Sequence, residues 1–207
     1  TIAYRIKGKT TYAMEGSIFI AGAGVQWLRD RMKFFKKAPE TEKIVKSLDN
    51  NNDIYLVPAF TGLGAPYWDA NARGVLSGIT RDTSPKEIVR ATIEAVAYQT
   101  FDLFEAMKHD GLRPKIVKVD GGMVMNNWFS QFLSDIVNVK VLRPQVQETT
   151  AAGAAFMAGL KVGVYKSLKD ISKNWQLNRK FSPKIKNNSR KNLIKGWSTA
   201  IKRTLIN

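Results

Sequence analysis

In the stretch VDGGMVMNNW, residues 119–128, two glycines lie between an apolar run and a pair of asparagines. The run from Ile116 to Val119 predicts a buried strand, and the asparagines are expected to open a helix. One explanation of Gly121 and Gly122 is a tight turn, because glycine tolerates positive φ. The other is a ligand that approaches the backbone closely, since strand–glycine–helix junctions often bind nucleotides. The motif alone leaves both explanations open.

A second candidate for ligand contact lies in AGAGVQW, residues 21–27. Gly22 and Gln26 are four residues apart, so on a helix they share one face. A glycine beside an amide side chain leaves room for a flat ligand and offers it hydrogen bonds. Ordinary helix packing explains the same two residues, and both interpretations stay open at this point.

Several other kinds of site are excluded by residue type. The chain has no G-x-x-x-x-G-K-[ST] loop and no complete G-x-G-x-x-G motif, because Tyr67 stands where the third glycine is needed. It has no cysteine and only one histidine, so a disulfide framework and thiolate or histidine zinc sites are excluded. We expect His109 to interact with the carbonyls of a helix end and Asp120 to order a turn.

The elements that must position these residues alternate between strands and helices. The clearest is a helix from Thr83 or Ser84 to His109, with Pro85 in its first turn, Glu87 completing a capping box and HDG closing it. The alternation predicts a single α/β domain without internal repeats or a flexible linker. Strands are also predicted at 2–6 and 10–15, joined as a hairpin by a turn at Lys7-Gly8-Lys9. The other predictions are strands at 54–60, 74–79, 115–119 and 139–144, and helices at 17–35, 40–48, 126–138 and 149–163, with two more helical segments at the end.

The net charge of +16 is concentrated at the C-terminal end. Residues 161–207 hold 13 lysines and arginines and one acid, whereas the other 160 residues hold 20 and 16. Such a region can bind nucleic acid or an anionic surface, or form a solvated helix face. Because aromatic residues are sparse there and no recognition motif is present, we predict no nucleic-acid binding.

Nothing in the sequence predicts a stable membrane insertion. The uncharged stretch from Gly16 to Leu28 is too short to span a bilayer, and the start of the chain lacks the apolar region of a signal peptide. We therefore expect a cytoplasmic protein, and the 44% content of hydrophobic residues supports a substantial core.

Longer motifs carry a family resemblance. TGLGAPYWDANARG (61–74), GVLSGITRDTSPKEIVRATIEAVAYQT (74–100) and VDGGMVMNNW together resemble the C-terminal domain of the glycerol kinases, members of the FGGY carbohydrate kinase family. YAMEGSIFIAGAGVQWLRD (12–30) and RPQVQETTAAGAAFMAGLKVG (143–163) are similar to the same family. The resemblance covers residues 1–183 and is weakest at the basic end.

The resemblance implies an actin-like ATPase, or ribonuclease H-like, α/β fold with ATP and substrate between two domains. Residues 1–183 would be most of the C-terminal, nucleotide-binding half, incomplete at its N-terminal side, and residues 184–207 a basic helix packed on it or extending from it. By motif position, Gly122 and Asn126 would contact the adenosine end of ATP or ADP, bound with Mg²⁺. Gly22 and Gln26 would line the same pocket.

The implied reaction transfers the γ-phosphoryl group of ATP to glycerol, giving sn-glycerol 3-phosphate. The segments that carry the family's catalytic base, its phosphate loop and most glycerol contacts have no counterpart in this sequence. We therefore assign no catalytic residue and no metal ligand, and expect the chain alone to be inactive. The expected partners are ATP, glycerol, the N-terminal domain of the same enzyme and further copies in a homo-oligomer.

Two alternatives to a glycerol kinase remain at this stage. One is another FGGY kinase that acts on a sugar or polyol. The other is a degenerate kinase half that works as a basic interaction module, for which steeply salt-dependent binding would be diagnostic.

Overall fold

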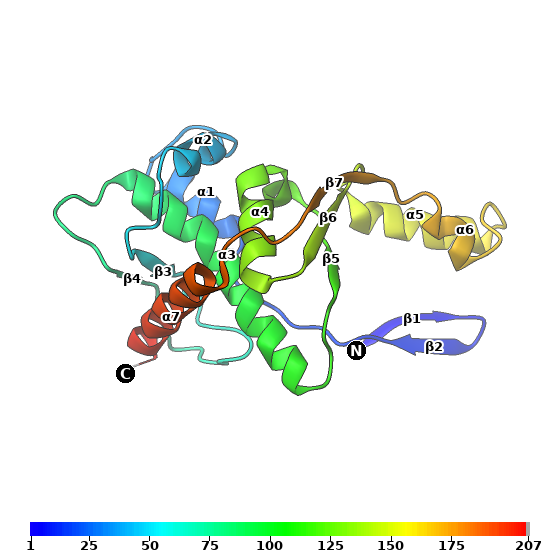
Figure 1. Ribbon diagram of the computed structural model, residues 1–207. Helices are drawn as coiled ribbons and strands as arrows, with labels where there is room; N and C mark the ends of the chain where they lie inside the picture. The colour runs from blue at the N-terminus through cyan, green and yellow to red at the C-terminus, as the bar shows by residue number, and fades with distance from the viewer. Residues whose placement is uncertain (206–207) are drawn as a thin grey trace.

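The computed structural model describes residues 1–205 and places a long helix at its centre (Figure 1). This helix, α3 (Pro85–His109), has the predicted capping box: the hydroxyl of Ser84 accepts from Lys86 N at 3.2 Å, and Glu87 Oε2 accepts from Ser84 N at 2.9 Å. Its residues from Val89 to Gln99 are buried. The predicted helix is confirmed at both ends.

The main sheet has three strands in the order β5-β6-β7. β5 (Ile116–Lys118) is parallel to β6 (Lys140–Pro144), and β7 (Leu177–Phe181) is antiparallel to β6. Helix α4 (Asn127–Val137) packs on β6 and β7 and also on α3, so it lies between the sheet and the central helix. A short 3₁₀ helix, η1 (Gly122–Met125), connects the end of β5 to α4. This sheet with its packed helices confirms the α/β architecture predicted from the sequence.

Strand β7 was not predicted from the sequence. Four of its five residues are exposed, so no alternation of apolar and polar residues marks it as a strand. It is held by backbone pairing with β6 from Val141 to Pro144. Such an edge strand depends on its partner more than on its own side chains.

Helix α1 (Gly22–Asp30) is shorter than the predicted helix at 17–35. The prediction from Ser17 was wrong because the segment before Gly22 is used as connecting chain: Ile20 is buried, and its carbonyl accepts from Gln99 Nε2 at 3.4 Å. At the other end, Lys33 has φ 59°, and Phe34 N donates to Leu28 O at 3.1 Å, which closes the helix.

The remaining elements surround this frame. Helix α2 (Glu40–Lys46) packs against α3 and α4. Helix α7 (Asn187–Thr204) packs against α4 and against the antiparallel pair of β3 (Tyr55–Val57) and β4 (Val75–Ser77). The predicted hairpin of β1 (Ile2–Ile6) and β2 (Lys9–Tyr12) is confirmed and projects from the body, as do α5 (Thr149–Lys161) and α6 (Leu168–Ser172) (Figure 1). Within the described chain, no helix is both long and apolar enough to cross a membrane.

Candidate functional site

The four residues selected from the sequence line one cavity of about 370 Å³. Gly22 and Gln26 come from α1, Gly122 from η1, and Asn126 from the junction between η1 and α4. The fold thus brings together two segments that are about 100 residues apart in the sequence. The cavity is also lined by Val25, Arg29, Ala38, Pro39, Thr41, Glu42, Ile93, Met123 and Met125.

The two explanations of the glycine pair apply to different residues. Gly121 has φ 85°, a left-handed backbone conformation, so the turn itself requires a glycine there. Gly122 does not have positive φ, and a Cβ built on it would meet no atom within 4 Å. The packing of the chain therefore gives no reason for a glycine at 122, whereas a ligand in the adjoining cavity would.

Adding a Cβ to each glycine of α1 likewise shows that the two glycines have different roles. A Cβ on Gly24 would lie 3.0 Å from Thr92 Cγ2, so this glycine allows α1 to pack closely against α3. A Cβ on Gly22 would meet nothing within 4 Å, and Gly22 faces the cavity. Among residues 1–205, the Gln26 side chain has no hydrogen-bond partner, which leaves its amide available to a ligand.

Asn126 has a structural role in addition to its place on the cavity wall. Its Oδ1 accepts from Phe129 N at 3.0 Å and so caps the N-terminus of α4. Its Nδ2 donates to Thr41 Oγ1 at 3.4 Å. The side chain is thereby oriented, and one N–H of its NH₂ group and one lone pair of Oδ1 retain capacity for a further contact.

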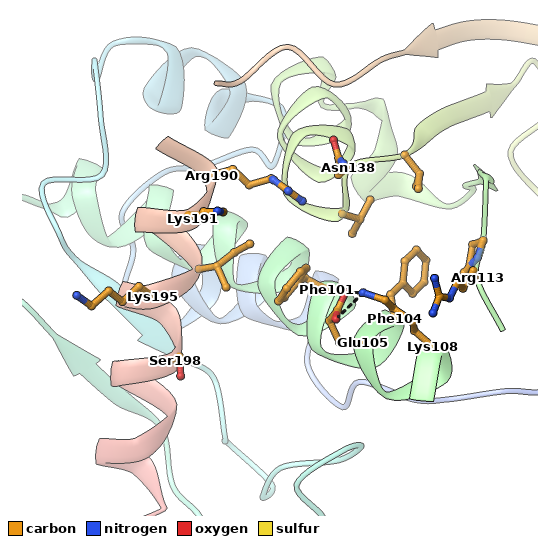
Figure 2. A pocket seen from close by; sticks show the side chains of 14 residues that line it. Phe101, Phe104, Glu105, Lys108, Arg113, Asn138, Arg190, Lys191, Lys195 and Ser198 are labelled. Carbon is orange, nitrogen blue, oxygen red and sulfur yellow. Dashed lines mark hydrogen bonds and ion pairs between the residues drawn. The ribbon is translucent and has the colours of Figure 1, made fainter. Parts of the chain in front are cut away.

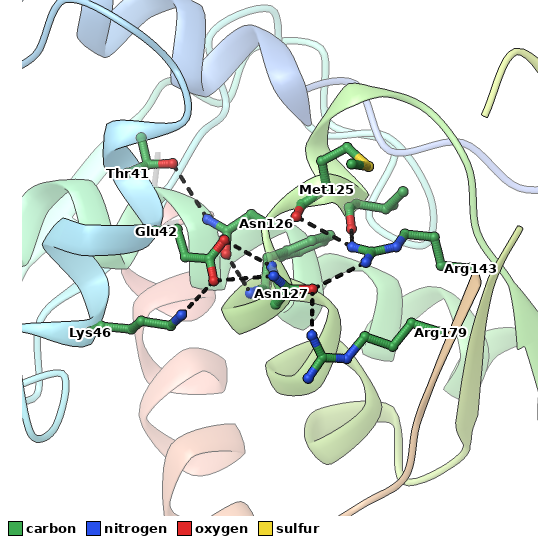
Figure 3. Close-up of polar contacts among 10 residues, drawn as sticks. Thr41, Glu42, Lys46, Met125, Asn126, Asn127, Arg143 and Arg179 are labelled. Atoms are coloured by element: carbon green, nitrogen blue, oxygen red, sulfur yellow. Dashed lines mark hydrogen bonds and ion pairs between the residues drawn. The ribbon is translucent and has the colours of Figure 1, made fainter. Parts of the chain in front are cut away.

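The sequence analysis missed two residues here: Glu42, which lines the cavity, and Asn127, which lies next to it and binds Glu42 (Figure 3). The carboxylate of Glu42 accepts from Asn127 N at 3.2 Å, from Asn127 Nδ2 at 3.4 Å and from Lys46 Nζ at 2.5 Å. Burial raises the pKa of Glu42, but these hydrogen bonds outweigh it and leave the pKa below its usual value. Asn127 was visible only as the second of two asparagines, and nothing in the sequence marked Glu42.

Arginines hold the other side of Asn127 (Figure 3). Arg143 is only 6% exposed; its Nη2 donates to Asn127 Oδ1 at 3.1 Å, and its Nη1 donates to Val124 O at 2.7 Å. Arg179 Nη1 donates to the same Asn127 Oδ1 at 3.0 Å. Within the described part of the chain Arg143 has no ion pair with a carboxylate, so neutral oxygens satisfy this buried cation.

Comparison with known proteins identifies the family. Residues 3–162 match the model of the C-terminal domain of the FGGY family of carbohydrate kinases. This chain belongs to the FGGY carbohydrate kinases. It is 55% identical over 203 residues to glycerol kinase 1 of Pseudomonas aeruginosa and 51% identical over 209 residues to the glycerol kinase of Sinorhizobium fredii. These matches cover 98% and 100% of the chain but only 41% and 42% of the relatives.

Solved structures of FGGY kinases agree with this assignment. One of them is the crystal structure of Plasmodium falciparum glycerol kinase with ADP. The chain superposes on it at a TM-score of 0.90 and 37% sequence identity, over 100% of this chain and 42% of that one. The xylulose kinase of Lactobacillus acidophilus has a TM-score of 0.75 at 22% identity, over 90% of this chain and 38% of that one, and is similar in fold alone.

A second, larger cavity of this FGGY kinase domain shares no lining residue with the first (Figure 2). It has a volume of about 630 Å³ and lies between α3, α7 and the end of α4, with Phe101 and Phe104 on α3. Its basic residues are Lys108, Arg113, Arg190, Lys191 and Lys195. Lys108 lies in the last turn of α3, where a cation offsets the partial negative charge of the helix terminus, and the last three lie in the first half of α7. We assign no ligand to this cavity.

Proposed function

We propose that the cavity between α1, α2 and η1 binds the adenosine part of ATP or ADP. We further propose that the chain is the ATP-binding portion of a glycerol kinase, which transfers the γ-phosphoryl group of ATP to glycerol and forms sn-glycerol 3-phosphate. The observation that carries this proposal is the convergence of Gly22, Gln26, Gly122 and Asn126 on one cavity. The similarity to glycerol kinases, one of them solved with ADP, supports the choice of ligand and substrate.

The lining of the cavity suits a nucleoside. Its volume falls within the range of about 300–1,000 Å³ typical of small-molecule sites. Val25, Ile93 and Met123 supply apolar surface for a flat base, while the amide groups of Gln26 and Asn126 supply polar contacts. The open space beside Gly22 and Gly122 lets a ligand approach the backbone.

We expect Mg²⁺ to reach this site together with the nucleotide. No group of three or more His, Cys, Asp or Glu side chains in residues 1–205 is placed to hold a metal ion. Mg²⁺ commonly binds through substrate phosphates and one or two carboxylates, keeping several of its waters. We therefore assign Mg²⁺ to the phosphates of the nucleotide and name no ligand for it on this part of the chain.

We also propose that this chain alone does not catalyse the transfer. Among the described residues, Glu42 is the only acid on the cavity wall, and its carboxylate is held by Asn127 and Lys46 with a lowered pKa. A general base needs a pKa near the working pH and access to the substrate hydroxyl. Most contacts to glycerol would then come from the N-terminal domain of the same enzyme, and the catalytic carboxylate from a segment of the C-terminal domain that this chain does not contain.

Gly122→Val tests the nucleotide site. The added side chain has room in the fold but occupies space that the adenosine needs, so we expect ADP affinity to fall at least about a hundredfold, about 2.8 kcal/mol. Isothermal titration calorimetry measures this loss. Gly153→Val, which also has open space but lies on α5, is the matched control and should bind ADP like the wild type. Unchanged ADP affinity in Gly122→Val would refute the assignment.

Substrate class is tested on the full-length enzyme. With ATP as donor, the phosphorylation rate should be far higher with glycerol than with xylulose or gluconate. A preference for either sugar substrate would show that the enzyme is a different FGGY kinase.

A further inference from the structure

We propose that Asn127 is a positioning residue for the nucleotide cavity, because it joins the two walls between which the ligand lies. The inference rests on the proposed nucleotide-binding function. Asn127 does not line the cavity itself. Its neighbours on either side, Glu42 of α2 and the η1 segment, do.

The hydrogen bonds of Asn127 have opposite polarity on its two sides (Figure 3). Toward α2 it donates from N and Nδ2 to the carboxylate of Glu42, at 3.2 and 3.4 Å. Toward the sheet its Oδ1 accepts from Arg143 and Arg179, at 3.1 and 3.0 Å. A side-chain amide can donate on one side and accept on the other, and these partners fix which way it points.

Arg143 extends this connection to the backbone of the cavity wall. Its Nη1 donates to Val124 O at 2.7 Å and to Met125 O at 3.3 Å, both in η1. The same short helix contains Gly122 and Met123, which line the cavity. Because Arg143 is buried, loss of any acceptor leaves a donor without a partner at a considerable cost. The guanidinium therefore holds η1 firmly, and Asn127 ties α2 to that fixed point.

The consequence is that Asn127 controls the distance between α2 and η1. Thr41 and Glu42 form the α2 side of the cavity, and Gly122 and Met123 form the η1 side. A site whose walls are already in place loses less entropy when its ligand binds. Weakening the Asn127–Glu42 contact should thus reduce nucleotide affinity although no ligand contact is removed.

Asn127→Asp tests this with nearly identical shape. The aspartate keeps an acceptor for Arg143 and Arg179, but it places a second carboxylate oxygen against Glu42, and like charges repel. We expect the dissociation constant for ADP to rise about tenfold, the effect of one lost hydrogen bond to a charged group. The midpoint of thermal unfolding should not fall, because the arginine pair gains a counter-charge. Asn188→Asp, an exposed site on α7, controls for the change in net charge and should leave ADP binding unaltered.

The double variant Glu42→Gln with Asn127→Asp provides the decisive comparison. The glutamine NH₂ can donate to the new aspartate, which restores the contact with reversed polarity. We expect ADP affinity to return to within about threefold of the wild-type value. Wild-type affinity in Asn127→Asp, or a double variant as weak as the single one, would overturn the proposal.

Hydrogen exchange separates this inference from the proposed function. The amide of Asn127 donates to Glu42, so its exchange should be faster in Asn127→Asp and slow again in the double variant, with or without nucleotide. If the wild-type chain failed to bind ADP, the proposed function would fail, while the exchange data would still test whether Asn127 holds the walls. Equal exchange in all three proteins would refute the positioning role.

Discussion

At the scale of single residues, Asp102 of α3 joins three parts of the fold. Its Oδ2 accepts from the hydroxyl of Tyr67 at 2.8 Å and from Nε1 of Trp197 at 2.7 Å. Tyr67 belongs to the loop that follows β3, and Trp197 to α7. Burial raises the pKa of Asp102 above its ordinary value of 3.8, and the two hydrogen bonds only partly offset that effect.

The raised pKa gives a prediction with a definite sign. The folded state binds the proton of Asp102 more tightly than the unfolded state, so the stability from this group is complete below about pH 4 and is lost as the pH rises through the folded pKa. Asp102→Asn keeps an acceptor without the charge, so its free energy of unfolding, relative to wild type, should increase from pH 4 to pH 7. Urea denaturation at the two pH values measures the difference; a constant difference would contradict the role given to Asp102.

Asp102→Ala addresses the hydrogen bonds themselves. The alanine leaves the donors of the half-buried Tyr67 and the buried Trp197 without an acceptor, and we expect a loss of about 1–3 kcal/mol per donor in the free energy of unfolding. Urea denaturation at pH 7 measures it. A loss no larger than that of Asp102→Asn would show that the two donors find other partners.

At the scale of elements, the sequence was sufficient to predict those helices and turns whose ends are determined by their own residues. The capping box of α3 and the Lys7-Gly8-Lys9 turn were predicted from the sequence, and a turn was one of the two explanations of the glycine pair that includes Gly121. Elements defined by tertiary contacts were not. The start of α1 depends on where the chain before Gly22 packs, and β7 depends on pairing with β6.

The candidate site follows the same division. The sequence marked Gly22 and Gly122 as positions where a ligand could approach, and the family resemblance grouped them. Glu42 and Asn127 could not be assigned, because an acid and an asparagine 85 residues apart become partners only when α2 packs on α4. Their importance comes from the tertiary fold and not from any local motif.

The capping box supplies the prediction at this scale. Ser84→Ala removes the side-chain acceptor for Lys86 N and should lower the free energy of unfolding by about 1 kcal/mol. Chemical denaturation measures the change. Among the described residues, α3 contributes only Ile93 to the cavity, and Ser84 lies nine residues before it and does not line the cavity, so ADP affinity should stay unchanged. Weaker ADP binding in this variant would contradict the separation of scaffold and site.

At the scale of the whole molecule, the chain covers about two fifths of the length of its relatives. Its projections carry exposed apolar side chains: Tyr12 of the hairpin and Val162 after α5 are each 75% exposed, and no residue of α5 is buried. Exposed apolar patches mark interaction surfaces. This distribution fits the proposal that the chain is one part of a larger kinase.

The net charge of +16 is the strongest remaining argument for a different function. A basic interaction module would bind polyanions through Lys and Arg with steep salt dependence. A nucleotide site built on the cavity at Gly22 and Gly122 would bind one small ligand saturably. One kind of experiment, a titration with each ligand, therefore distinguishes the two functions.

The most direct test is calorimetric titration of the purified chain with Mg·ADP, with a short DNA duplex as the parallel ligand and circular dichroism to establish that the chain is folded. We predict saturable one-to-one binding of ADP and no tight binding of DNA. A folded chain that does not bind ADP, and whose binding to DNA depends strongly on salt, would contradict the assignment of a kinase nucleotide site.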